Sequence, residues 1–199
     1  MHGETAPAPR AAKRRRDAAR NRDRLLAAAR TVFAEQGHDV ALEEIARAAE
    51  VSRTTLYRNF ASREDLTATI YADNLTRIER RAAELAGSPV GVIALFEYVL
   101  DFQLSTRAVA PVLSRTDTAL FADLGARTAA AFRPLVEAGA EVLRPGVGLR
   151  EILLAVGMAE VSAGESDPAV RAHDHARSRA ILRHGLFTDA GVAAYESQL

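Results

Sequence analysis

The most constraining feature of the sequence is the stretch 40–66, VALEEIARAAEVSRTTLYRNFASREDL, in which two short amphipathic segments meet at a tight break. In the first segment, from about Leu42 to Ala49, apolar residues recur at helical spacing. Ser52 is a good N-cap residue and opens the second segment, which ends near Asn59. We therefore expect two short helices, with a supporting helix before them and a helical body after them.

The outward face of the second segment is rich in hydrogen-bonding side chains and has no acidic one. Its residues are Arg53, Thr54, Thr55, Tyr57, Arg58 and Asn59. A solvated face needs only Glu and Lys, whereas a guanidinium can bond a guanine edge twice, and hydroxyl or amide groups suit phosphate oxygens. The helix N-terminus adds a partial positive charge that favours anions. The pattern favours DNA binding over a helical hairpin that only packs.

Positive charge concentrates at and before this stretch. Residues 1–66 hold 13 Lys and Arg against 10 Asp and Glu, whereas residues 67–199 hold 13 against 16. Residues 1–16 combine two prolines, a glycine and a basic run without apolar periodicity, so we expect a disordered arm. The arm is either a solvated tail or a contact to DNA phosphates, and the neighbouring pattern favours the contact. The phosphate-binding residues expected in it are Lys13, Arg14, Arg15 and Arg16.

A supporting helix is expected from about Asp17 to Gln36, where Gly37 supplies a stop. Its apolar stripe consists of Leu25, Leu26, Ala29, Val32 and Phe33. This stripe is the surface that we expect to pack behind the two short helices.

The stretch resembles the N-terminal DNA-binding domain of the TetR family of transcriptional regulators. The matching residues are Ile45, Ala46, Val51, Ser52, Thr55, Leu56, Tyr57, Phe60, Ser62, Glu64 and Leu66. So many positions in fixed register, over about 45 residues, are much harder to meet by chance than a lone short motif. The resemblance implies that the helix at 52–59 lies in the major groove. It implies DNA contacts from Ser52, Arg53, Thr54, Thr55, Tyr57, Arg58 and Asn59, and a phosphate contact from Arg63.

The sequence departs from the family pattern at four positions in this region. Ala41 stands where a Ser or Thr N-cap is expected, although Asp39 offers a nearby carboxylate. Glu50 replaces the usual glycine of the turn, where a positive φ would be strained. Thr54 occupies the place of a smaller residue, and Arg63 that of a lysine. Thr54 and Arg53 affect which DNA sequence is bound more than the mode of binding.

The rest of the chain is read as helical. Ser62 caps a long helix with Asp65 as its capping-box partner, and this helix reaches the Gly87–Pro89 region. Further helices are expected at about 89–105, 117–143, 149–163 and 168–187, with a short segment around 110–114. No alternating strand pattern occurs in the sequence. We predict an all-α fold with a three-helix helix-turn-helix DNA-binding domain at 17–66 and a helical ligand-binding and dimerisation domain at 67–199.

By the same resemblance, the second domain encloses a small-molecule pocket and its last two long helices form a homodimer interface. The pocket candidates are Phe96, Leu100, Gln103, Phe121, Phe132 and Met158, although ordinary core is the simpler reading for any one of them. Glu97, Asp101 and Gln103 are the polar positions of interest for burial. The helix at 149–163 is apolar over much of its circumference, and a stripe of Ala172, Ala176 and Ala180 suits close packing.

Several other classes of protein lack support in the sequence. There is no cysteine, and no apolar run is long enough to span a membrane, so we expect a cytoplasmic protein. His173 and His175 are spaced poorly for a metal pair, and solvent exposure is the simpler reading. We expect no cofactor and no catalytic residues, and an enzyme or a helical interaction protein without DNA binding is the alternative. The leading hypothesis is a repressor that binds a palindromic operator as a homodimer and is released by a small-molecule ligand.

Overall fold

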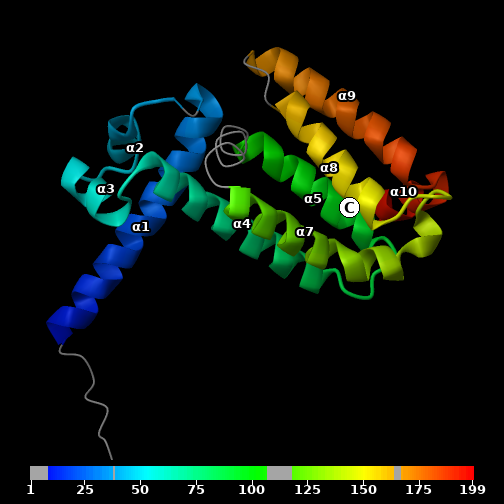
Figure 1. Ribbon diagram of the computed structural model, residues 1–199, viewed down its shortest axis with the longest axis horizontal. Coiled ribbons are helices and arrows are strands. Elements are labelled where there is room, and N and C mark those ends of the chain that lie inside the picture. The colour runs from blue at the N-terminus through cyan, green and yellow to red at the C-terminus, as the bar shows by residue number, and fades with distance from the viewer. Residues whose placement is uncertain (1–8, 38, 107–117, 164–166) are drawn as a thin grey trace, which may run out of the picture. The chain divides into compact units, whose positions relative to one another are not determined.

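The computed structural model describes residues 9–37, 39–106, 118–163 and 167–199, and within these ranges it is helical without a strand (Figure 1). The helices are α1 (Pro9–Gln36), α2 (Leu42–Ala48), α3 (Arg53–Asn59), α4 (Arg63–Glu84), α5 (Gly91–Thr106), α7 (Thr118–Ala138), α8 (Leu149–Ala163), α9 (Pro168–Leu186) and α10 (Asp189–Glu196). A short 3-10 turn, η1, covers Ala140–Val142. The all-α fold predicted from the sequence is confirmed.

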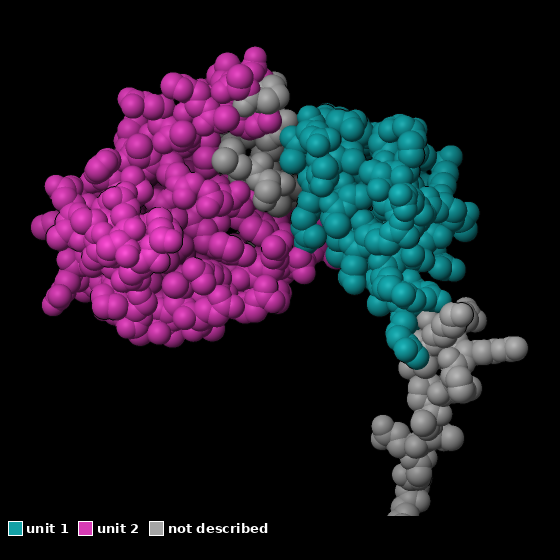
Figure 2. Space-filling model, turned by 180° about the vertical axis from the view of Figure 1, so that it is seen from behind, with its two compact units in different colours: residues 1–66 teal, residues 67–199 magenta. Residues whose placement is uncertain are grey.

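The chain divides into two compact units, unit 1 at residues 1–66 and unit 2 at residues 67–199 (Figure 2). Unit 1 holds α1, α2 and α3 and the first residues of α4. The remainder of α4 and all later helices belong to unit 2.

The core of unit 1 forms where α1 packs on α2 and α3. Its buried side chains are Leu25, Leu26, Ala29, Val32, Phe33, Leu42, Ile45, Ala46, Ala49, Leu56, Phe60 and Leu66. Gly37 ends α1 with a φ of 86°, and its N–H donates to the Phe33 carbonyl at 3.0 Å. Arg22 of α1 lies over the Phe60 ring, with Cζ 4.6 Å from the ring centroid. The expected apolar stripe therefore does pack behind the two short helices.

The turn between α2 and α3 is formed by Glu50, whose φ of 51° lies in the left-handed region that glycine prefers. The Val51 N–H donates to the Ala46 carbonyl and the Glu50 N–H to the Arg47 carbonyl, both at 3.0 Å. These two bonds satisfy carbonyls at the end of α2 and fix the angle at which the chain enters α3. The strain expected at Glu50 is therefore present.

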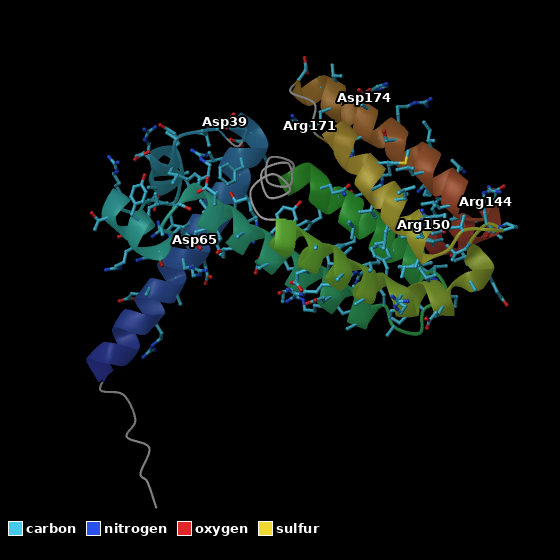
Figure 3. The ribbon with its side chains drawn as sticks, in the orientation of Figure 1. Asp39, Asp65, Arg144, Arg150, Arg171 and Asp174 are labelled. Carbon is cyan, nitrogen blue, oxygen red and sulfur yellow. The ribbon has the colours of Figure 1, made fainter. Side chains whose placement is uncertain are left out.

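The N-termini of the helices differ in how well they are capped. Ala41 at the start of α2 has extended backbone angles, φ −61° and ψ 136°, but offers no side-chain hydrogen bond. Ser52 accepts from the Thr55 N–H at 3.1 Å and so caps α3. At α4, Ser62 accepts from the Asp65 N–H at 3.2 Å while Asp65 accepts from the Ala61 N–H at 3.0 Å (Asp65 is labelled in Figure 3). The caps expected at Ser52 and Ser62 are confirmed.

Unit 2 is built around α5, which packs against α7, α8 and α10, while α8 and α9 pack against each other (Figure 1). The side chains of α5 at its centre are fully buried, and Phe96 meets Phe187 edge to face at 5.5 Å between ring centroids. Arg127 of α7 donates two hydrogen bonds to Glu79 of α4, each 2.8 Å long. Arg144 joins the end of α9 to α10 through the His184 carbonyl and Asp189, at 2.6 and 2.7 Å (Figure 3).

Two helix boundaries differ by more than a few residues from those expected. The first helix begins at Pro9 rather than near Asp17, so residues 9–16 are helical instead of disordered; Pro suits a first helical position, and the Ala, Lys and Arg that follow are good helix formers. The helix expected at 117–143 ends at Ala138, and the chain passes through Gly139 into the 3-10 turn η1. Gly139 lies close to α5, where a Cβ would approach Val92 Cγ1 to 2.8 Å. The segment expected near 110–114 lies outside the described residues.

The eight-residue helix α10 was not expected at all. Thr188 caps it by accepting from the Gly191 N–H at 3.1 Å. Gly191 is buried against Val142, where a Cβ would approach to 2.7 Å. The N-cap threonine, with Val192 and Tyr195 three residues apart, was the available signal, but a helix of two turns has too few periodic positions to stand out.

Candidate nucleic-acid interface

The outward face of α3 forms as the sequence predicts. Leu56 and Phe60 point inward and are fully buried, which turns the opposite face to solvent. The exposed residues of that face are Ser52, Arg53, Thr54, Tyr57 and Arg58, and none of them is acidic. The result is a capped helix, packed on one side only, that presents donors and hydroxyls outward.

Arg53 and Tyr57 are held together with one acid, Glu43, which α2 contributes. Glu43 Oε1 lies 3.0 Å from Arg53 Nε in an ion pair and accepts a long hydrogen bond of 3.4 Å from the Tyr57 hydroxyl. Arg53 Cζ lies 5.5 Å from the centroid of the Tyr57 ring. The three side chains form one cluster at the surface, which the sequence did not reveal because the α2 residue comes from another helix.

Three other expected contact residues have partners within unit 1. Asn59 donates from Nδ2 to the Thr55 carbonyl at 2.7 Å, and Thr55 Oγ1 lies 2.9 Å from Ser52 Oγ. Arg63 donates from Nη2 to the Val40 carbonyl at 2.6 Å, which ties the start of α4 to the start of α2. These hydrogen bonds stabilise the helices around the exposed residues.

The basic residues of α1 are described only in part. Arg16 is exposed on the first helix, whereas the side chains of Lys13, Arg14 and Arg15 lie outside the described residues. Further along α1, Arg24 pairs with Glu50 across the turn at 2.7 Å, so this cation neutralises the acid that replaces the expected glycine.

The pocket candidates of unit 2 have different environments. Phe96, Leu100 and Phe132 are fully buried in its core, and Gln103 donates from Nε2 to the Val156 carbonyl at 2.9 Å. Met158 lies on the surface of α8, where 61% of it is exposed. The side chain of Phe121 lies outside the described residues.

A buried polar cluster joins α5 to α9 and α10. Arg179 contacts Glu97 and Asp101, and Arg183 Nη1 lies 3.8 Å from Glu97 and 3.4 Å from Glu196. Of the three polar positions of interest, Glu97 is buried, Gln103 is half-buried and Asp101 is exposed. Burial raises the pKa of the Glu97 carboxyl, although the charge of Arg179 opposes the effect.

His175 corrects the expectation of a solvated histidine, because only 2% of it is exposed. Neither ring nitrogen reaches a hydrogen-bond partner in the described structure. Burial lowers the pKa of the imidazole, and the nearby charge of Arg179 lowers it further. His173, two residues away on α9, is exposed as expected.

The outer face of α8 and α9 exposes apolar side chains. Leu154 and Met158 on α8 are each 61% exposed, and Ile181 on α9 is 65% exposed. A Cβ placed on Gly157 of α8 would meet nothing within 4 Å. The stripe of Ala172, Ala176 and Ala180 is exposed or half-buried on the same helix pair. This face has the small and apolar residues of a surface suited to close helix packing.

Membrane-spanning helices and metal-binding clusters are both absent from the described residues. No helix there is both long and apolar enough to cross a membrane. No group of three or more His, Cys, Asp or Glu side chains in those ranges is placed to hold a metal ion.

Comparisons with known proteins agree with this arrangement. Residues 25–70 match the family model described as bacterial regulatory proteins, tetR family. A TetR transcriptional regulator from Streptomyces coelicolor is 27% identical, with a TM-score of 0.63 over 84% of this chain and 99% of that chain. A TetR transcription regulatory protein from Mycobacterium vanbaalenii is 24% identical, with a TM-score of 0.63 over 87% of this chain and 99% of that one.

A third solved structure is that of the TetR-like regulator LfrR from Mycobacterium smegmatis in complex with proflavine. It is 23% identical, with a TM-score of 0.60 over 85% of this chain and 97% of that chain. A sequence search among curated proteins finds no match. The family model covers the helices of unit 1 that carry the exposed polar face, and the solved structures share the fold of both units.

Proposed function

We propose that this chain, a member of the TetR family of transcriptional regulators, represses transcription by binding a palindromic operator as a homodimer, and that a small molecule bound in unit 2 releases it. The observation that carries the proposal is the acid-free outward face of α3, capped by Ser52 and backed by buried Leu56 and Phe60. Such a helix suits the major groove, because it offers donors to base edges and its N-terminus to phosphate.

We assign the DNA interface to eight residues of unit 1: Ser52, Arg53, Thr54, Thr55, Tyr57, Arg58, Asn59 and Arg63. Of these, Ser52, Arg53, Thr54, Tyr57 and Arg58 are exposed and can meet DNA directly. Thr55, Asn59 and Arg63 reach it only by exchanging internal hydrogen bonds for bonds to DNA, so we expect smaller effects from their loss. The basic face at the start of α1, including Arg16, adds phosphate contacts that carry no sequence information.

The exposed apolar face of α8 and α9 supports a homodimer. One short recognition helix makes few base contacts, whereas two of them about 34–36 Å apart read both halves of a palindrome. Leu154, Met158 and Ile181 would lose their exposure to water in such an interface, which favours association.

Ligand control is the part of the proposal that rests most on the family. LfrR was solved with proflavine, a small molecule. In this chain Phe96, Leu100, Gln103 and Phe132 are the side chains that we retain as candidates for ligand contact. A ligand changes DNA affinity only if it binds the two states of the protein unequally, so we expect it to favour a tilt of α4 that changes the separation of the two DNA-binding units.

Binding of the full-length protein to the DNA upstream of its own gene tests the interface. We expect Arg53→Ala combined with Tyr57→Phe to weaken binding by about 10-fold or more, because a bidentate base contact and a hydroxyl contact are lost. Arg47→Ala is the matched control, since Arg47 is an exposed cation of α2 that pairs with Glu44 on its own helix. Equal affinities for wild type and the double variant would show that α3 does not read DNA.

A further inference from the structure

We infer that Glu43 is a positioning residue that holds Arg53 ready to bind guanine, so that each operator half-site carries a guanine opposite Arg53. The inference rests on the proposed DNA binding through α3. It assigns a role to an acid of α2 that stands beside the recognition helix, where a negative charge is otherwise unfavourable for a polyanionic partner.

Arg53 is held from two sides. Its Nε lies 3.0 Å from Glu43 Oε1 in an ion pair, and its Cζ lies 5.5 Å from the centroid of the Tyr57 ring. The Tyr57 hydroxyl donates to the same Glu43 oxygen at 3.4 Å, so the acid positions both groups. The Arg53 side chain is nevertheless 71% exposed, which leaves its far end accessible.

The contact to Glu43 determines which donors remain for DNA. Arginine has one N–H on Nε and two on each terminal nitrogen. The contact of Arg53 with Glu43 is at Nε, so we take the terminal nitrogens Nη1 and Nη2 as the pair left for DNA. That pair matches the O6 and N7 acceptors of guanine, whereas adenine presents a donor where guanine presents O6. An arginine fixed in this way selects guanine.

Stability alone does not account for the Glu43–Arg53 pair. Exposed ion pairs contribute little to folding, and both partners here are substantially exposed. The neighbouring acid Glu44 shows the ordinary alternative, because it pairs with Arg47 three residues along the same helix at 2.6 Å. Glu43 instead reaches across to α3, where a fixed rotamer of Arg53 reduces the conformational entropy lost on binding DNA.

The experiment uses the full-length protein and begins with selection of bound duplexes from a random pool. Affinity is then measured for the selected duplex and for versions in which each guanine of the half-site is replaced by adenine. We expect one replacement to weaken wild-type binding by about 10-fold or more and to have no effect on Arg53→Ala, which identifies the guanine bound by Arg53.

The variant Glu43→Ala tests the positioning role, with Glu44→Ala as the matched control. Both remove one negative charge from α2, so both raise affinity for DNA of any sequence to a similar degree. Only Glu43→Ala is expected to reduce the guanine-to-adenine affinity ratio, by about 3-fold or more, because only that side chain orients Arg53. In the Arg53→Ala background, Glu43→Ala should leave the ratio unchanged.

Two results would overturn the inference while leaving DNA binding intact. One is an equal guanine-to-adenine ratio in wild type, Glu43→Ala and Glu44→Ala. The other is a selected half-site in which no guanine depends on Arg53. Failure of the wild type to select any sequence would instead contradict the proposed function itself, so the two failures are distinguishable.

Discussion

At the scale of single residues, the left-handed backbone of Glu50 stores strain in the turn that sets the direction of α3. We predict that Glu50→Gly is more stable than Glu50→Ala by about 1 kcal/mol, because only glycine adopts this conformation without a Cβ penalty. Both variants lose the ion pair to Arg24, so their difference isolates the backbone. Chemical denaturation of the two variants measures it, and equal free energies of unfolding would contradict the strain.

A second residue-scale prediction concerns the uncapped start of α2. Ala41 already has the extended backbone that an N-cap needs. Ala41→Thr should therefore raise the free energy of unfolding by about 1 kcal/mol, because a hydroxyl can accept from a free N–H of the first turn. Ala41→Val has the same shape without the oxygen and is the control. If the Thr and Val variants unfold at the same denaturant concentration, the cap does not form.

Sequence patterns predicted local features at this scale better than long-range ones. The Ser52 cap depends only on residues within one turn, so it could be predicted. The positive φ at Glu50 was suggested only by the family resemblance, which has glycine there. The contacts of Glu43 and Arg63 join different helices and depend on tertiary packing, which the pattern of one helix does not specify.

At the scale of elements, the packing of α9 on α5 buries a titratable group, His175. The groups that affect its pKa are Arg179 of α9, whose charge lowers it, and the Leu100 backbone and Asp101 of α5, which raise it. The pKa of His175 lies below its ordinary value of 6.5, mainly through burial. The unfolded chain therefore binds this proton more readily, and the contribution of His175 to stability is lost as the pH falls below about 6.5.

Glu97 acts in the opposite direction, because its raised pKa makes the folded state bind a proton more readily as the pH falls towards 4.5. Comparison with a variant separates the two groups. We predict that His175→Gln loses less stability than wild type between pH 7.5 and pH 5.5, measured by denaturant unfolding. His173→Gln removes an exposed histidine of the same helix and should behave as wild type. If the free energy of unfolding changed with pH in parallel for wild type and His175→Gln, the prediction would be contradicted.

The burial of His175 was not predicted because it belongs to a polar stripe of α9. His175, Arg179 and Arg183 recur every four residues, and such a stripe is usually exposed to solvent. Here His175 is buried, and Arg179 and Arg183 are partly buried where α5 supplies the acids Glu97 and Asp101 as partners. Long apolar patterns, as in α4 and α8, were predicted closely, whereas paired charges and the short α10 depend on neighbours that are remote in sequence.

At the scale of the whole molecule, the proposed dimer depends on the outer face of α8 and α9. We predict that Leu154→Asp makes the protein monomeric and weakens operator binding by about 10-fold or more, because the second recognition helix is lost. Leu199→Asp is the control, since Leu199 is an exposed leucine outside that face. Sedimentation measures the mass of the protein in solution, and fluorescence anisotropy measures its affinity for the operator. If the Leu154→Asp variant remained a dimer, the interface would have to lie elsewhere.

The all-α fold and the family resemblance could be predicted because they rest on periodicity and on a motif in fixed register. The residues of a ligand pocket could not be predicted. An apolar side chain gives the same sequence pattern whether it lies in a core, in a cavity wall or at an interface. Met158 illustrates this, because its apolar character suggested a pocket whereas its exposure places it on the outer face of α8.

The most direct test of the central claim is hydrogen exchange of the full-length protein with and without a selected operator duplex. The account predicts slower exchange on DNA binding in α3 and at the start of α4, residues 53–66. A shuffled duplex at the same concentration is the control and should protect these amides less. Protection confined to unit 2, or unchanged exchange in α3 under saturating DNA, would contradict the claim that this helix reads the operator.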